Sequence, residues 1–220
     1  MKKLVIFDLD GTLIDTIADL AFSTNYALKA CGFPTHETDE YRFFVGNGIR
    51  KLFERALPED ARTEENILRI RDLFLPHYDL HNIDQSTPYP GMPELLERLQ
   101  EAGYLLAVAS NKHQSATEKI IPALFPQIHF HPVFGQREGI PVKPDPAIVK
   151  NILQITGINR EETLYVGDSG VDMQTARNAG VTVCGVTWGF RPRNELQSYA
   201  PNYFADTPND IYLALQESNK

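Results

Sequence analysis

The sequence is poor in cysteine, in positive charge and in long apolar runs. Its two cysteines, Cys31 and Cys184, form no Cys-x-x-Cys pair, which argues against a zinc or redox site and fits a reducing compartment. Lys and Arg number 21 against 29 Asp and Glu, and this net charge of −8 argues against nucleic acid or an anionic membrane as a partner. No stretch approaches the roughly 18 apolar residues of a membrane helix, and Asp8 ends the first apolar run too early for a signal peptide. We therefore expect a soluble cytoplasmic protein.

Internal repeats and low-complexity segments are also lacking, and 42% hydrophobic with 23% charged residues is typical of a globular chain. Its 220 residues suffice for one large domain or for one domain with an insert. Residues 15–87 contain helical patterns and no convincing strand, and a Pro/Gly-rich junction follows at 87–93. Helices are expected at 16–30, 48–57 and 64–78.

Strands alternate with helices of about ten residues in the rest of the chain, a pattern that predicts a parallel sheet with helices on both faces. We expect a core of residues 1–14 and 88–220 and a helical cap of residues 15–87. The expected strands are 4–7, 104–109, 133–135, 163–166, 181–186 and 203–205, and the expected helices are 94–102, 115–121, 147–156, 173–179 and 209–216.

A pair of carboxylates follows the first expected strand. Asp8 and Asp10 are two residues apart in an extended segment, so both side chains project from one face. Two close carboxylates resist joint ionisation, and a cation or a shared proton relieves the repulsion. The pair thus indicates a metal site or acid/base chemistry, although a strand followed by an Asp-Gly turn is the simpler interpretation.

Two further expected strands end in polar residues, Ser110-Asn111 and Gly167-Asp168-Ser169. The carboxyl ends of parallel strands meet at one edge of a sheet, where ligands bind. Four carboxylates, counting Asp172, would place a formal −4 there, and each like-charge pair costs several kcal/mol. Lys143 offsets one of these negative charges, and a divalent cation with oxygen ligands would offset two more. Mg²⁺ is the cation that fits best.

These residues suit phosphate chemistry. Ser110 can offer a hydroxyl, Asn111 a backbone N–H and Lys143 a positive charge to phosphate oxygens. Asp8 can attack phosphorus as a carboxylate nucleophile, while Asp10 can protonate a leaving oxygen and then activate water.

The order of these segments resembles the haloacid dehalogenase-like hydrolase superfamily, with motifs at 8–12, 110–111, 143–144 and 167–172. The resemblance implies an α/β fold, with a Rossmann-like parallel sheet core and an inserted all-helical cap. It implies that Asp8 is the nucleophile and Asp10 the general acid/base. Mg²⁺ would be held by the Asp8 carboxylate, the Asp10 carbonyl and Asp168, with Asp172 acting indirectly or through water. The phosphoryl group would be held by Thr12, Ser110, Asn111 and Lys143.

Less specific segments resemble phosphoglycolate phosphatases: 44–48, 110–112, 143–146, 165–169 and 186–189. The expected activity is hydrolysis of a small phosphorylated metabolite, and the substrate that this resemblance favours is 2-phosphoglycolate. Relatives acting on pyrophosphate, sugar phosphates or nucleotides share these segments. A phosphomutase of the β-phosphoglucomutase type, a metal-free dehalogenase and a non-enzymatic phospho-accepting switch remain alternatives.

Cap residues are harder to interpret. Asn47, in a Gly-Asn-Gly turn, and Arg50 are candidate substrate contacts, because Arg suits bidentate binding of a carboxylate. The alternatives are a simple turn and a solvated helix charge. Asp172 can be merely a first-turn acid, His113 can face solvent and Trp188 can serve packing. A monomer and a homodimer are both compatible with the sequence.

Overall fold

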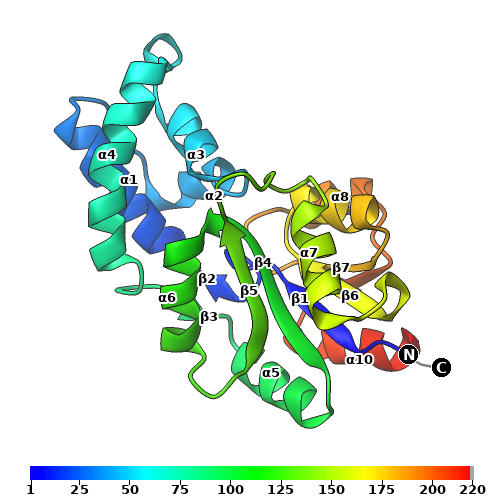
Figure 1. The fold of residues 1–220 in the computed structure, drawn as a ribbon. Helices are drawn as coiled ribbons and strands as arrows, with labels where there is room; N and C mark the ends of the chain where they lie inside the picture. The colour runs from blue at the N-terminus through cyan, green and yellow to red at the C-terminus, as the bar shows by residue number, and fades with distance from the viewer. Residues whose placement is uncertain (219–220) are drawn as a thin grey trace.

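A six-stranded parallel sheet forms the centre of the computed structural model, which describes residues 1–218 (Figure 1). The strand order is β5-β4-β1-β6-β7-β8, so β1 lies between β4 and β6. Every residue of β1 is buried, as expected for a strand covered on both faces. The strands are β1 Leu4–Phe7, β4 Leu105–His113, β5 Phe130–Gln136, β6 Thr163–Gly167, β7 Thr182–Val186 and β8 Tyr203–Ala205.

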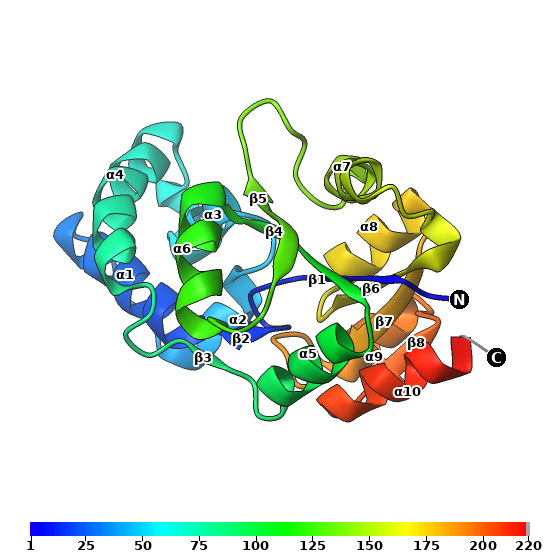
Figure 2. The same cartoon turned by 60° about the horizontal axis from the view of Figure 1, so that its bottom comes forward.

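Helices cover both faces of this sheet, on either side of β1 in Figure 2. Val5 and Phe7 pack with α5 Met92–Glu101, α6 Gln114–Leu124 and α10 Pro208–Ser218. Leu4 and Ile6 pack with α7 Ala147–Thr156, α8 Gly170–Ala179 and α9 Arg193–Ser198. Alternate residues of one strand thus bury opposite faces of the sheet, which confirms the predicted α/β core.

Four α-helices form an insert between β1 and α5: α1 Ile17–Ala30, α2 Tyr41–Phe44, α3 Ile49–Ala56 and α4 Glu64–His81. They share a hydrophobic cluster, which the core residues Ala116 and Phe190 join. A two-stranded antiparallel ribbon, β2 Ile14–Asp15 with β3 Thr87–Pro88, carries the chain out and back. The ribbon lies at both expected junctions, and the division into domains at residues 14 and 88 stays a prediction.

The expected helices and strands are present, with shifted ends. α8 begins at Gly170 rather than 173, because Ser169 and Asp172 form a capping box. β4 continues to His113, so Ser110 and Asn111 lie inside the strand rather than after it. The short α2, α9, β2 and β3 were not predicted, because two to six residues are too few to show a period. No helix of residues 1–218 has the length and apolarity to cross a membrane.

Candidate functional site

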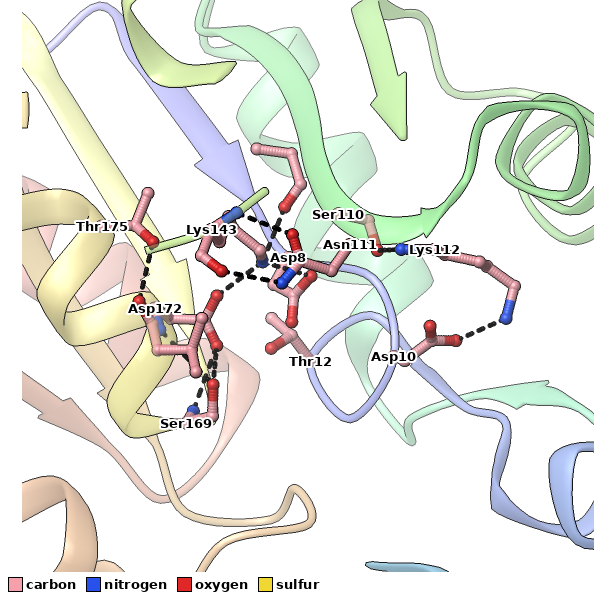
Figure 3. A network of polar contacts seen from close by, with 12 residues as sticks. Asp8, Asp10, Thr12, Ser110, Asn111, Lys112, Lys143, Ser169, Asp172 and Thr175 are labelled. Atoms are coloured by element: carbon pink, nitrogen blue, oxygen red, sulfur yellow. Dashed lines mark hydrogen bonds and ion pairs between the residues drawn. The ribbon is translucent and has the colours of Figure 1, made fainter. Parts of the chain in front are cut away.

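The polar ends of β1, β4 and β6 converge at one edge of the sheet (Figure 3). Asp8 directly follows β1, Ser110 and Asn111 lie in the last part of β4, and Asp168 directly follows β6. All four side chains are buried. The sequence predicted this convergence, and parallel pairing of the three strands produces it.

Lys143 lies between Asp8 and Asp172 at this edge (Figure 3). Its Nζ lies 2.8 Å from Asp8 Oδ1 and 2.7 Å from Asp172 Oδ1, and it also donates to the Ala109 carbonyl and the Tyr165 hydroxyl. Burial lowers the pKa of Lys143, but the charges of Asp172 and Asp8 outweigh burial and raise this pKa well above its usual value. The ammonium group is therefore charged and fully hydrogen-bonded.

Asp172 is a first-turn residue of α8, and its carboxylate also contacts Lys143. Its Oδ1 accepts hydrogen bonds from Lys143 Nζ and, at 3.0 Å, from the Tyr165 hydroxyl. Its Oδ2 accepts from the backbone N–H and the hydroxyl of Ser169, which caps α8. Both oxygens are thus occupied by donors, so Asp172 holds Lys143 in place and is poorly suited to bind a cation directly.

Asp8 and Asp168 retain lone pairs for a cation. One oxygen of each lies, with one of Asp172, in a group whose members are within 4.8 Å of one another. Burial, followed by the charge of Asp172, raises the pKa of Asp8 to about 7. Burial and the charges of Asp172 and Asp8 also raise the pKa of Asp168, although the Phe190 N–H donates to Asp168 Oδ2 at 2.7 Å. The available metal ligands are thus all carboxylate oxygens, which suit a hard divalent ion. Burial makes ionisation of these carboxylates costly, and a bound cation would offset this cost.

Thr12 contacts the Asp168 carboxylate rather than open space. Its buried hydroxyl lies 3.4 Å from Asp168 Oδ1, and its carbonyl accepts a hydrogen bond from Trp188 Nε1 at 3.1 Å. Trp188 also packs against the core cluster of the sheet. The expected packing role of Trp188 is therefore confirmed, and the indole also holds the loop that carries Asp10 and Thr12.

Lys112 is a site residue to which the sequence analysis assigned no role. Its buried Nζ lies 2.9 Å from Asp10 Oδ1 and also donates a hydrogen bond to the Tyr78 hydroxyl. Asp10 Oδ1 accepts a second hydrogen bond from the Thr16 hydroxyl. Burial lowers the pKa of Lys112, but the interactions with Asp10 and Tyr78 outweigh burial, so this pKa is raised above its usual value. The available signal was its place, two residues after Ser110 on a strand that ends at the site. With this second ammonium, the four carboxylates leave a formal charge of −2, which one divalent cation balances.

A cavity of about 260 Å³ lies over these residues. Asp8, Asp10, Ser110, Lys112 and Lys143 line its core side. Its other wall comes from the inserted helices and their loops. That wall carries one acidic side chain, Asp79, which pairs with Lys119. The rest of the wall is largely apolar, with Leu20, Val45, Gly46, Gly48, Ile49, Leu52, Phe74, Leu75 and Tyr78. The charged core side of the cavity thus faces a wall that is largely apolar apart from Asp79.

The structure places Arg50 away from the cavity, and its contact with substrate stays a prediction. Arg50 is half-exposed, bonded to Glu54 and Glu64, and absent from the cavity lining. Successive helix residues are turned by about 100°, so Arg50 points away when Ile49 and Leu52 face the cavity. Asn47 Oδ1 is likewise bonded to Arg55, at 2.7 Å, and only the flanking glycines of its turn reach the cavity.

Asn111 joins three parts of the site. Its Oδ1 accepts from the Lys143 backbone N–H at 2.8 Å, and its Nδ2 donates to the carbonyls of Lys143 and Gly46. The side chain thus fixes the Lys143 loop and one turn of the inserted segment. His113 also lines the cavity, although its side chain is exposed and pairs with the Ser115 hydroxyl.

Comparison with known proteins agrees with this geometry. Residues 5–186 match the family model described as haloacid dehalogenase-like hydrolase. A phosphoglycolate phosphatase of Mesorhizobium japonicum is 37% identical to this chain, and the match covers 88% of this chain and 86% of that protein. A phosphoglycolate phosphatase of Aquifex aeolicus is 32% identical, and the match covers 95% of this chain and 94% of that protein. A crystal structure from Lactobacillus delbrueckii subsp. bulgaricus superposes with a TM-score of 0.92 and 32% identity, covering 98% of this chain and 99% of that one.

Proposed function

Since the chain belongs to the haloacid dehalogenase-like hydrolase family, we propose that it is a Mg²⁺-dependent phosphatase acting on a small phosphomonoester, 2-phosphoglycolate. One observation carries the proposal. Asp8 lies at the floor of a small cavity, paired with Lys143 and beside a second buried carboxylate, Asp168, that keeps lone pairs for a cation.

In the proposed mechanism, an Asp8 oxygen attacks phosphorus while the bond from phosphorus to the leaving oxygen breaks. The Ser110 hydroxyl and the Asn111 backbone N–H hold the phosphoryl oxygens. The positive charge of Lys143, which lies 2.8 Å from Asp8 Oδ1, stabilises the negative charge of the phosphoryl group, and Thr12 orients Asp168. Asp10, protonated at the start, gives its proton to the leaving oxygen and then takes one from the water that hydrolyses the aspartyl-phosphate. Inorganic phosphate leaves, the Asp8 carboxylate is restored and Asp10 is protonated again. Mg²⁺, held by Asp8, Asp168 and the Asp10 carbonyl, would neutralise phosphate charge.

The substrate is proposed from the size of the site and from the relatives. A cavity of about 260 Å³ lies below the roughly 300–1,000 Å³ of sites for drug-sized ligands, which favours a small metabolite over a nucleotide. Two similar proteins are phosphoglycolate phosphatases. A cytoplasmic location and a monomeric or homodimeric state stay predictions.

The decisive assay measures phosphate release from 2-phosphoglycolate, pyrophosphate, hexose phosphates and nucleotides, with EDTA and with Mg²⁺. We expect Mg²⁺-dependent release, greatest for 2-phosphoglycolate. Asp8→Asn should lower kcat by at least about 10³-fold, because it removes the nucleophile. Acid-quenched wild-type enzyme should carry one extra phosphoryl mass on the peptide containing Asp8.

Asp60→Asn is the matched control, because Asp60 is exposed and distant in sequence from every site motif. It should keep wild-type rates, and circular dichroism should show all three proteins folded. Full activity in EDTA would favour a dehalogenase, and isomerisation of a hexose phosphate without phosphate release would favour a phosphomutase. Substantial activity in folded Asp8→Asn would contradict the mechanism.

A further inference from the structure

The Lys112 ammonium has capacity for a further acceptor. Figure 3 shows its side chain reaching Asp10 from the end of β4. Asp10 Oδ1 and the Tyr78 hydroxyl take two of its three N–H donors, and no described residue takes the third. Since Lys112 and Tyr78 both line the cavity, this donor is placed where a bound molecule can accept it.

The other basic side chains around the cavity are less suitable. Lys143 already contacts Asp8, Asp172, the Ala109 carbonyl and the Tyr165 hydroxyl. His113 is exposed and pairs with Ser115. The wall opposite Lys112 is apolar apart from Tyr78 and Asp79, and the Asp79 carboxylate pairs with Lys119. A second anionic group on a phosphorylated substrate would therefore be attracted to Lys112.

Tyr78 adds a donor from the opposite wall. Its hydroxyl oxygen accepts from Lys112 Nζ, so the phenolic hydrogen remains free to donate. Tyr78 belongs to α4 and Lys112 to β4, so the pair brings one group from the inserted helices and one from the sheet to the same point. An ammonium and a hydroxyl together match the two oxygens of a carboxylate.

We propose that Lys112, with Tyr78, binds a carboxylate at the non-phosphoryl end of the substrate and so selects phosphorylated small hydroxy acids over neutral phosphomonoesters. This inference deepens the proposed phosphatase function and rests on it. A neutral competitor leaves the Lys112 donor unpaired in a buried place. Without Lys112, a substrate carboxylate would face apolar side chains and the carboxylate of Asp79. Both mismatches are costly, so a single residue can set the preference, by about 10- to 100-fold.

The test compares two substrates of similar size, 2-phosphoglycolate and 2-hydroxyethyl phosphate, which differ in the carboxylate. In Lys112→Met we expect the ratio of their kcat/KM values to fall by about 10- to 100-fold. Tyr78→Phe removes only the hydroxyl and should lower the ratio several-fold, which keeps the test valid if Lys112→Met does not fold. Lys150→Met, an exposed lysine of α7, is the matched control and should leave the ratio unchanged.

A binding measurement separates this inference from the proposed activity. Calorimetry would compare 3-phosphonopropionate, a non-hydrolysable analogue of 2-phosphoglycolate, with propylphosphonate, which lacks the carboxylate. We expect wild type to prefer the carboxylate and Lys112→Met to lose that preference. If wild type hydrolyses neither ester yet shows this pattern, the proposed activity fails and the inference stands.

Three results would overturn the inference. The first is equal binding of the two phosphonates by wild type, and the second is an unchanged preference in Lys112→Met. The third is an equal loss of kcat/KM for both esters with no change in the binding preference. This last result would show that Lys112 acts only by positioning Asp10.

Discussion

Asp168 is held between two glycines whose side-chain positions it fills. A Cβ added to Gly11, which has a φ of 87°, would lie 2.3 Å from Asp168 Oδ2. A Cβ added to Gly189 would lie 2.3 Å from Asp168 Cβ and 2.4 Å from the Gly11 carbonyl. Atoms do not approach this closely, so both glycines fix the position of a proposed metal ligand.

Gly189→Ala should therefore displace Asp168 and lower kcat/KM by about 10²-fold, because misplacement by about 1 Å can cost that much. The apparent affinity for Mg²⁺, measured from the dependence of rate on metal concentration, should fall as well. Gly185→Ala is the matched control, since its added Cβ would meet only ordinary contacts of 3.5 Å or more. Wild-type rates and metal dependence in Gly189→Ala would contradict this account.

At the scale of elements, the inserted helices are anchored where the chain returns to the sheet. Asp19, buried in α1, accepts hydrogen bonds from the backbone N–H groups of Gln85 and Ser86 and from the Ser86 hydroxyl. These residues directly precede β3, one strand of the ribbon. One carboxylate thus ties the first inserted helix to the segment that leaves the insert.

Asp19→Ala would leave these donors without a partner in a buried place. Each unsatisfied group costs about 1–3 kcal/mol, and some will find water, so the free energy of unfolding should fall by roughly 3 kcal/mol. Urea denaturation followed by circular dichroism measures this loss. Asp72→Ala removes an exposed ion pair with Arg71 and should change stability by no more than about 0.5 kcal/mol. An equally small effect in Asp19→Ala would show that the anchor is unimportant.

At the scale of the whole molecule, the acidic site should make the metal-free protein less stable as pH rises. The pKa of Asp8 is raised from 3.8 to about 7, and that of Asp168 is raised too. Between pH 3.8 and about pH 7, the folded state keeps the proton of Asp8 while the unfolded state has released it. The free energy of unfolding therefore falls as pH increases through this range. Each such group contributes a slope of up to about 1.4 kcal/mol per pH unit.

Urea denaturation in EDTA from about pH 5 to 8 should show this decline for wild type relative to Asp8→Asn. The comparison matters because burial and His81 lower the pKa of His77, which gives a slope of opposite sign, common to both proteins. Mg²⁺ should flatten the difference, because it stabilises the charged carboxylates. A difference between the two proteins that does not depend on pH would contradict the proposed electrostatics.

Much of this protein follows from its sequence. Apolar runs alternating with helical patterns predicted the parallel sheet, because parallel strands buried on both faces need such runs. Polar residues at the ends of these runs predicted the convergence of Asp8, Ser110 and Asp168, since the carboxyl ends of parallel strands share an edge. These features are local in the chain, and repetition or spacing makes them readable.

Only the tertiary structure decided which side chains meet across elements. The bond from Lys112 to Tyr78 joins residues 34 positions apart, on a strand and an inserted helix. Arg50 is turned away from the cavity by the phase of α3, and Gly189 approaches Asp168 through a loop after β7. Such contacts depend on how elements pack in space, which the spacing of residues does not encode. The sequence alone thus determined the sheet and its acidic edge, and the packing of the inserted helices decided how the cavity above it is lined.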